Sequence, residues 1–559
     1  MKRACYFFSG REVWFHLPIL LRENGIEPVL WLGHPIHDET VKETYPECEL
    51  LDYMKTNKGV TSLQSVDSRK TNRNNPIPLE YIQSISFYKL KDKVIKMMDR
   101  QDDYLYYRRI DREAVFYSLF NYFYRKIVNN QIDILICSEA PHFPAEYMIY
   151  GLCEILSIPR IHFLPSSVAP FILIKKSING DWVRLNTPSS RTQDLKRIMS
   201  EYVDSLQVSQ EEIEEPDYMK KQKSFDEKLS NNNKLSQVSP SNLFQRIFRK
   251  LQREGFKSIT IAILRIPILR KLLNSILIKN FKTKLGLDAI EKKINYKRWY
   301  TIQSLNLIEE PIEIIINDPE SNKIKNKIKI LQKSEYDLVS QEVSLETEYI
   351  YFPLHYEPER TTNPEGGDYY NAYDTLLALR SLIPQEIPIY VKEHYSQFSH
   401  ALHGHRGRSH YFYRAILSIP NVVIVNINYS SIELIDNAEL TASITGTACL
   451  EAACRGRKSL IFGNTWFSGC PNVYKFDQLN DYQELADAPI SSSHQIKEYF
   501  NALIEQYAIV GCTNPGTETR YRTKYPDIFN QSFDEDMLKD IVSALSTLGI
   551  IEKDEVHQG

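Results

Sequence analysis

The feature that most constrains the fold is the repeated alternation of short, wholly apolar runs with stretches of helical character. Apolar runs of this kind are typical of buried strands in a parallel sheet, whose crossover connections are helices. The alternation occupies residues 1–165, fades, and returns between residues 348 and 462. The sequence therefore predicts an α/β fold with two Rossmann-like domains.

The expected elements follow one another in both regions. In the first region the sequence predicts a strand at 5–8, a helix at 12–24, a strand at 28–31, a strand at 132–137, a helix at 144–156 and a strand at 161–164. In the second region it predicts strands at 349–352, 387–391, 422–425, 440–444 and 459–462, and helices at 369–382, 410–417, 431–437 and 448–455. Two such sheets face each other across a cleft, and ligands bind beyond the carboxyl ends of the strands.

The chain has 559 residues, which exceeds the ~250–300 residues at which a single hydrophobic core stops growing. We expect an N-terminal Rossmann-like domain at 1–168, a largely helical insertion and linker at 169–345, a C-terminal Rossmann-like domain at 346–530, and a final helix and tail at 531–559. The insertion is predicted from its clustered Ser and Asn, its runs of charge and its few strand signals.

One part of the insertion, residues 246–284, is strongly basic. Its Lys and Arg residues are opposed only by Glu254 and are interleaved with Ile, Leu and Phe. Such a stretch can lie on an anionic membrane surface, or it can be a solvated helical face packed on the protein. The sequence leaves both interpretations open.

Charge and cysteine content narrow the function classes. The formal net charge is -3, so no global positive field attracts nucleic acid, and no recognition motif for it is present. The eight cysteines are scattered, with no C-x-x-C pair and no zinc-finger spacing, which favours a reducing compartment. No secretory signal precedes the first strand, so we expect a cytoplasmic protein without a membrane-spanning helix.

The most informative segment is Thr445-Gly446-Thr447, because it follows a predicted strand directly and opens a helix. The free amide groups and the positive dipole end of a helix favour phosphate, and the Thr hydroxyls can donate hydrogen bonds. Glu451 lies one turn further on and can face a ribose diol. The structural alternative is a Thr447 helix cap with Glu451 as an ordinary early-helix acid.

Two further segments leave strands at their carboxyl ends. Lys392 and His394 share one face of an extended chain and can both meet a phosphate oxygen. The loop after the strand 349–352 carries His355, Glu357 and Arg360. Because the three loops follow strands of one sheet, we expect them to converge on one cleft, although polar loops at strand ends are also common structural features.

These segments resemble the capsule polysaccharide biosynthesis family, which includes transferases of Kdo. The resemblance rests on the string YFPLHYEPERTT at 351–362, on VKEH at 391–394, on TGTACLEA at 445–452 and on LIFGNTWF at 460–467. It covers roughly residues 348–475; the N-terminal domain is similar in pattern only.

The resemblance implies a GT-B glycosyltransferase that acts in capsule, O-antigen or lipopolysaccharide synthesis. Its C-terminal domain would hold the nucleotide sugar, and its N-terminal domain would hold a glycan or lipid-linked acceptor. His394 and the segment 445–447 would contact the donor phosphate, although Tyr395 stands where related proteins have Pro. A CMP-linked acidic sugar such as Kdo is the first candidate donor, and a UDP- or GDP-linked hexose stays open.

No metal and no cofactor are expected, because no Asp-x-Asp motif stands after a suitable strand; the nucleotide sugar is a co-substrate. Without a metal, protein donors must stabilise the departing phosphate. The acceptor hydroxyl needs a general base from the facing domain. Candidates are Glu139 and His142 after the strand 132–137, with Glu12 and His16 as alternatives. Glu139 is the preferred candidate, although it is equally well explained as a loop or capping acid.

Two rivals use the same cleft. One is a non-catalytic glycan- or lipid-binding assembly protein that docks on the membrane, and a catalytic base in the cleft would argue against it. The other is a sugar-nucleotide epimerase of the same architecture, which also grips a diphosphate at a helix N-terminus; nucleotide release without any need for an acceptor would favour it.

Overall fold

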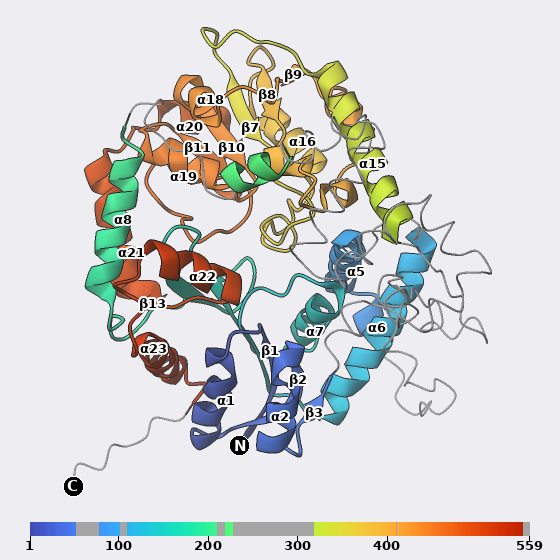
Figure 1. Cartoon of the computed structure of the whole chain (residues 1–559), viewed down its shortest axis with the longest axis vertical. Coiled ribbons are helices and arrows are strands. Elements are labelled where there is room, and N and C mark those ends of the chain that lie inside the picture. Colours follow the sequence, from blue (N-terminus) through green and yellow to red (C-terminus); the bar gives the residue numbers. More distant parts are fainter. Residues whose placement is uncertain (52–77, 101–108, 209–218, 227–317, 410, 552–559) are drawn as a thin grey trace, which may run out of the picture.

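The molecule contains two sheets, one in each of two stacked domains, with helices packed around them (Figure 1). This arrangement confirms the predicted α/β class. The computed structural model describes residues 1–51, 78–100, 109–208, 219–226, 318–409 and 411–551.

The first domain is built on a seven-stranded sheet in the order β13-β6-β5-β4-β1-β2-β3. The strands from β5 to β3 are parallel, whereas β6 and β13 are antiparallel to their neighbours. Phe7 of β1 pairs with Cys137 of β4, so these two central strands end together. The strands are β1 (Lys2–Phe8), β2 (Ile26–Gly33), β3 (Glu49–Leu50), β4 (Ile134–Cys137), β5 (Arg160–Pro165), β6 (Phe171–Lys175) and β13 (Ala508–Val510).

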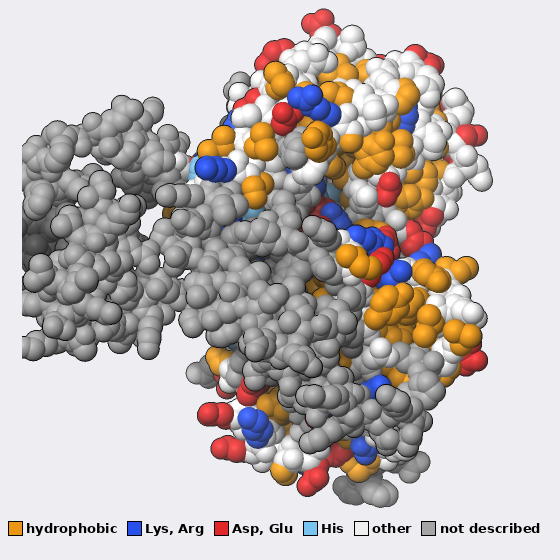
Figure 2. All heavy atoms as spheres, turned by 90° about the vertical axis from the view of Figure 1, so that its right-hand side faces the viewer, with side chains coloured by type: hydrophobic (Ala, Val, Ile, Leu, Met, Phe, Trp, Pro, Cys, Tyr) orange, Lys and Arg blue, Asp and Glu red, His pale blue; other side chains and the backbone are white. Residues whose placement is uncertain are grey.

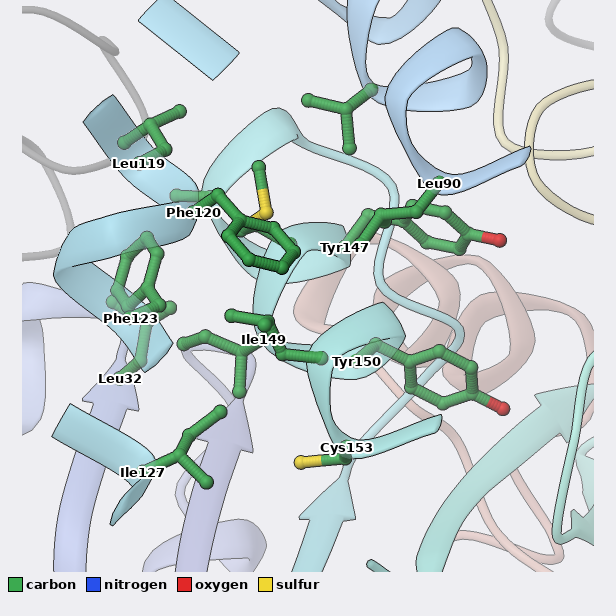
Figure 3. Close-up of a cluster of buried hydrophobic side chains, with 14 of the residues drawn as sticks. Leu32, Leu90, Leu119, Phe120, Phe123, Ile127, Tyr147, Ile149, Tyr150 and Cys153 are labelled. Atoms are coloured by element: carbon green, nitrogen blue, oxygen red, sulfur yellow. The ribbon is translucent and has the colours of Figure 1, made fainter. Parts of the chain in front are cut away.

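Helices cover both faces of this sheet. Figure 3 shows one core, where Phe120 and Phe123 lie near Ile149 and Leu90 packs close to Tyr147. A Cβ on Gly151 would lie 2.4 Å from a methyl of Leu90, so glycine is required for the close packing of α5 and α7. The helices are α1 (Val13–Glu23), α2 (Asp38–Thr44), α4 (Leu79–Ile82), α5 (Ile85–Met97), α6 (Arg109–Asn129), α7 (Pro144–Ile155) and α8 (Thr192–Ser205), with 3-10 turns η1 (Pro35–His37) and η3 (Met98–Arg100).

The second domain is built on a six-stranded, wholly parallel sheet in the order β12-β11-β10-β7-β8-β9. Its strands are β7 (Ile350–Pro353), β8 (Ile389–Lys392), β9 (Val422–Ile424), β10 (Leu440–Ser443), β11 (Ser459–Ile461) and β12 (Val473–Lys475). Its helices are α15 (Asp318–Val339), α16 (Ala372–Leu382), α17 (Phe412–Ile416), α18 (Ser431–Asn437), α19 (Thr447–Cys454), α20 (Tyr482–Asp487) and α21 (Ser493–Tyr507), with turns η6 (Tyr395–Gln397), η7 (Gly404–Arg406) and η8 (Phe476–Gln478).

The chain returns to the first domain at its C-terminal end, which corrects the expected boundary at residue 530. Strand β13 joins the first sheet beside β6, and α22 (Pro515–Lys524) and α23 (Phe533–Thr547) follow it. Figure 1 shows α23 beside α1. The apolar residues Met537 and Ile541 pack into the core of the first domain, which is why the last helix belongs there.

The region 169–345 is only partly described. Strand β6 belongs to the first sheet rather than to a linker, whereas α8, the short helix at 219–226 and α15 agree with the expected helical character. The basic stretch 246–284 lies outside the described residues.

The two domains touch through polar contacts as well as through shared core. Lys89 pairs with Asp368 at 2.8 Å, and the Asn363 amide donates to the Lys93 carbonyl at 3.1 Å. Basic and acidic side chains gather at the boundary between the domains in Figure 2. Within the described parts of the chain, no helix is both long enough and apolar enough to cross a membrane.

Candidate functional site

The candidate site lies at the carboxyl end of the second sheet. Strand β7 has β10 on one side and β8 on the other, so the loops that follow these three strands are neighbours. His355 follows β7, His394 follows β8, and Gly446 follows β10. The expected convergence of the three segments is therefore present in the fold.

His355 joins the loops after β7 and β10. The backbone amide of Thr445 donates to Nε2 of His355 at 3.3 Å, and Ser443 Oγ lies 3.0 Å from the same nitrogen. A nitrogen that accepts from an amide carries no proton, so the ring proton of His355 is on Nδ1. Nδ1 lies 3.5 Å from the hydroxyl of Thr361, which donates to Glu359 at 2.9 Å.

The charge state of His355 follows from its surroundings. Burial, together with the nearby His394 and Arg408, lowers its pKa to about 3. His355 is therefore neutral at physiological pH, and it acts as a fixed acceptor that holds the segment after β10. The amide of Leu354, which precedes His355, donates to the Lys392 carbonyl at 2.8 Å, so the segments that carry His355 and His394 run side by side.

His394 presents a hydrogen-bond donor. Its Nδ1 accepts from the backbone amide of Ser396 at 3.1 Å, which caps the turn η6. The proton of the neutral ring is therefore on Nε2, for which no partner is found among the described residues. Burial lowers the pKa of His394 to about 4, and Lys392 and Arg408 act in the same direction. The ring offers one N–H donor without a charge.

Gly446 precedes the first turn of α19 and brings the backbone close to His355. A Cβ at this position would lie 2.6 Å from Ser443 Oγ and 3.5 Å from His355 Nε2. The first amide groups of a helix have no intrahelical acceptor, and the helix dipole is positive there. Gly446 is the N-cap of α19 and has no capping side chain, so the structural alternative of a Thr447 cap does not hold.

The hydroxyls of the same segment are used within the protein. Thr445 donates to the carbonyl of Thr361 at 2.6 Å, so its hydroxyl ties two loops together. Thr447 is hydrogen-bonded to Glu451. Burial raises the pKa of Glu451, and Thr447 and Arg455 oppose this rise. The backbone of the helix start, rather than the Thr445 hydroxyl, is thus left for a ligand.

Lys392 is only partly available. Its ammonium donates to the Tyr429 carbonyl at 2.5 Å and to Ser431 Oγ at 3.0 Å, at the start of α18. Its charge is still close enough to lower the pKa of His394. Lys392 therefore adds positive potential to the site, whereas its expected direct contact to a phosphate would require it to leave these two acceptors.

Glu139 and Arg360 meet across the two domains. Arg360 forms an ion pair with Glu139 and another, at 2.9 Å, with Glu365. Burial disfavours the charged guanidinium, but Glu365 and Glu139 outweigh burial and raise the pKa of Arg360. Thr513 and Asn514 also lie 3.4 Å from the Glu139 carboxylate. Neither group has the unshared charge that a general base or a phosphate ligand needs.

His142 is the other predicted base. Its Nδ1 lies 3.1 Å from the Ala140 carbonyl; because a carbonyl only accepts, Nδ1 carries the proton and Nε2 is an acceptor. Burial lowers its pKa well below the usual range, and Arg100 and Arg360 act in the same direction. The ring is therefore neutral, with a lone pair on Nε2. Glu12 and His16 are exposed at the start of α1.

Arg408 carries no sequence signal of function, but it holds the site in place. Its guanidinium pairs with the buried Glu393 at 3.0 Å and donates to the His355 carbonyl at 2.7 Å. Tyr413 donates to the same carboxylate at 2.7 Å. Arg408 thus fixes the loop that carries His355. Only Glu393 could have been singled out, since it lies between Lys392 and His394.

Glu357 lies two residues beyond His355 in the loop that follows β7. Its backbone is held on both sides by Gln397, whose side chain accepts from the Glu357 amide at 2.9 Å and donates to the Glu357 carbonyl at 3.1 Å. The carboxyl group lines a separate cavity. The described residues contain no cluster of three or more His, Cys, Asp or Glu that could hold a metal ion.

No protein-family model and no curated protein sequence matches the chain. Among solved structures, a β-Kdo 2,7-transferase, KpsC, from Thermosulfurimonas dismutans is 15% identical with a TM-score of 0.21; the match covers 33% of this chain and 55% of that chain. A UDP-GlcNAc 2-epimerase from Neisseria meningitidis bound to UDP-GlcNAc is 12% identical with a TM-score of 0.18; the match covers 98% of this chain and 100% of the epimerase. A glycosyltransferase from Rickettsia africae is 10% identical, with 95% and 99% covered and a TM-score of 0.19.

Proposed function

We propose that this chain is a glycosyltransferase that moves a sugar from a nucleotide-activated donor to a glycan acceptor. The observation that carries the proposal is the pairing of two unused donor sets in one place. His394, with its Nε2 proton, follows β8 and the first amides of α19 follow β10, on either side of β7 and the His355 that follows it. Helix N-termini with such donors are ready-made anion sites.

The site has the chemistry that a departing nucleotide phosphate needs. Negative charge develops on the phosphate oxygen as the glycosidic bond to the donor breaks, and preorganised donors that need no rearrangement stabilise it. His355 fixes the backbone that carries the amides, and the nearby Lys392 adds positive potential. In this proposal the nucleotide sugar is a co-substrate, and the protein donors act without a metal.

The acceptor would bind between this site and the carboxyl end of the first sheet. His142 follows β4 and keeps a lone pair on Nε2, so we assign it the role of accepting the proton of the acceptor hydroxyl. Glu139 is assigned a positioning role, because it is already paired with Arg360. This assignment reverses the preference for Glu139 that the sequence suggested.

The finer identity of the substrates rests on the resemblance of residues 351–362, 391–394 and 445–452 to capsule polysaccharide enzymes. We propose a CMP-linked acidic sugar as the donor and a lipid-linked surface glycan as the acceptor, at the inner face of the cytoplasmic membrane. The basic stretch 246–284 is the proposed membrane contact; deleting it should release the protein from anionic vesicles, and unchanged binding would refute that contact.

The first experiment is a thermal-shift screen against CMP, CDP, UDP, GDP and their sugar conjugates, with EDTA present. A ligand that binds only the folded state raises the melting temperature. The His394→Ala variant should lose the shift, whereas the control His494→Ala, at a side chain that is 79% exposed on α21, should keep it. No shift with any nucleotide would refute the proposal and favour a glycan-binding assembly protein.

Measuring nucleotide release with and without an acceptor then distinguishes a transferase from an epimerase. Nucleotide release that depends on an added glycan acceptor supports a transferase. Release that proceeds equally fast without any acceptor would refute transfer and indicate an epimerase.

A further inference from the structure

A second polar cavity, of about 310 Å³, opens beside the His355 loop. Arg408 separates the two sites, because it donates to the His355 carbonyl and also lines the cavity. The wall comes from Glu357, from the start of α16 at Asn371, and from α17 at Phe412. Lys96 of the first domain closes one side. The cavity therefore spans both domains without sharing the amide donors of α19.

The charges in this cavity do not suit a phosphate. Lys96 pairs with Asp99 at 3.1 Å, and Arg408 pairs with Glu393 at 3.0 Å. Both cations are thus neutralised by partners within the protein. Glu357 forms no ion pair among the described residues, although Lys96 and Arg408 act on it from a greater distance. An anionic ligand would find no unshared positive charge here and would face one additional carboxyl group.

The polar groups suit hydroxyls instead. Burial raises the pKa of Glu357, whereas Lys96, Arg408 and a hydrogen bond with Thr362 oppose the rise. The carboxyl can still accept hydrogen bonds from hydroxyl groups at its other lone pairs. Asn371 uses its Oδ1 to cap α16 by accepting from the Tyr373 amide at 3.0 Å. Its NH2 group is therefore left as a donor, with no partner among the described residues. A carboxyl and an amide in the wall of one cavity suit the hydroxyls of a sugar.

The mouth of the cavity is aromatic. Tyr373, Tyr411 and Phe412 line it, and Tyr411 is 66% exposed. The guanidinium of Arg408 lies 4.4 Å from the ring centre of Phe412, which holds that ring in place. Aromatic faces pack on the C–H groups of sugar rings while polar groups in the wall bind the hydroxyls. The volume is at the lower end of the ~300–1,000 Å³ of small-molecule sites.

We propose that this cavity binds a neutral sugar residue of the glycan acceptor, at one remove from the reacting hydroxyl. The proposal rests on the proposed function for the identity of the glycan as an acceptor, but the binding itself does not need the donor. Because Lys96 comes from the first domain and the other wall residues from the second, an occupied cavity also holds the two domains together.

The test is saturation-transfer NMR on the full chain with a mixture of free glucose, galactose, mannose, N-acetylglucosamine and lactose. We expect ring-proton signals from at least one sugar. Tyr411→Ala and Glu357→Gln should each weaken the apparent affinity roughly tenfold or more, as expected for the loss of a buried hydrogen bond or packing surface. Because Tyr411 is largely exposed, its truncation leaves the fold intact even where Glu357→Gln does not.

Two controls assign the signal. Tyr117→Ala removes a ring that is 41% exposed on α6 and should leave the sugar signal unchanged. His394→Ala should also leave it unchanged while it abolishes the nucleotide thermal shift. Sugar signals that survive Tyr411→Ala, or no signal from any sugar while the nucleotide shift is present, would overturn the inference and leave the proposed function standing. Absence of both signals would overturn both.

Discussion

In both domains the carboxyl ends of parallel strands form one edge of the sheet. The two edges differ in how far their polar groups are already used in contacts within the protein. In the second domain, His394 and the start of α19 keep donors that have no partner in the described part of the chain. In the first domain, Glu139 is already satisfied by Arg360. The comparison teaches that a polar residue after a strand marks a possible site, but that its hydrogen-bond partners decide whether a ligand can use it.

The largest expected effect comes from replacing Arg408, which holds the loop that carries His355. Arg408→Leu should lower the free energy of unfolding by about 3–5 kcal/mol, because it leaves the buried Glu393 carboxylate without its partner. Urea denaturation measures this loss. Arg414→Leu, at an exposed ion pair with Glu335, is the control and should leave stability almost unchanged. Equal effects of the two changes would contradict the supporting role of Arg408.

Removing the His394 ring, which offers a hydrogen-bond donor to the ligand, should lower turnover. His394→Ala should lower kcat by roughly 10²–10³-fold, the usual effect of losing one preorganised donor to a developing anion. The melting temperature should change little, because the ring makes only one hydrogen bond, to Ser396. A large fall in melting temperature with normal specific activity would show that His394 is structural.

Replacing His142 tests whether the first domain supplies the catalytic base. His142→Ala should lower turnover by about 10²-fold at unchanged nucleotide affinity, because His142 follows β4 of the first domain, whereas the proposed phosphate donors follow β8 and β10 of the second. Single-turnover kinetics with saturating nucleotide sugar measures the step. A turnover close to that of the unaltered protein would remove His142 from the mechanism.

Replacing Glu139, which is already paired with Arg360, should lower turnover less than replacing His142. Glu139→Gln keeps the shape of the side chain but removes its charge, so we expect turnover to fall less than about tenfold and stability to fall by about 1–3 kcal/mol. Glu12→Gln, at an exposed acid near the same edge, is the matched control. A loss of 10²-fold or more in turnover would restore Glu139 as the base.

The smallest effect concerns pH. The pKa values of about 3 for His355 and about 4 for His394 lie below that of an unfolded histidine. The unfolded chain therefore binds more protons as pH falls below about 6.5, and stability is lost toward the folded-state values. Above that range the two rings stay neutral. Affinity for a CMP-linked sugar, whose phosphodiester does not titrate there, should be flat from about pH 6.5 to 8 by calorimetry; a step near 6.5 would mean that a histidine binds the phosphate as a cation.

Most of the scaffold could be predicted from the sequence. The apolar runs at 5–8, 132–137 and 349–352 correspond to β1, β4 and β7, because a strand buried on both faces requires such a run wherever it occurs. The edge strand β13 could not be found in this way. Its three residues are too short to show a pattern, and their place beside β6 is set by contacts far along the chain.

The candidate site, like the scaffold, could be predicted from the sequence only in part. That His355, His394 and Gly446 follow strands of one sheet could be predicted from the amino-acid sequence, because chain order and the rules of parallel topology place those loops at one edge. Which of the groups can still bind a ligand became visible only in the folded molecule. Whether Glu139 finds Arg360, or Thr445 finds Thr361, depends on distances between segments far apart in sequence, and the strength of a charge or a hydrogen bond depends on those distances and on burial.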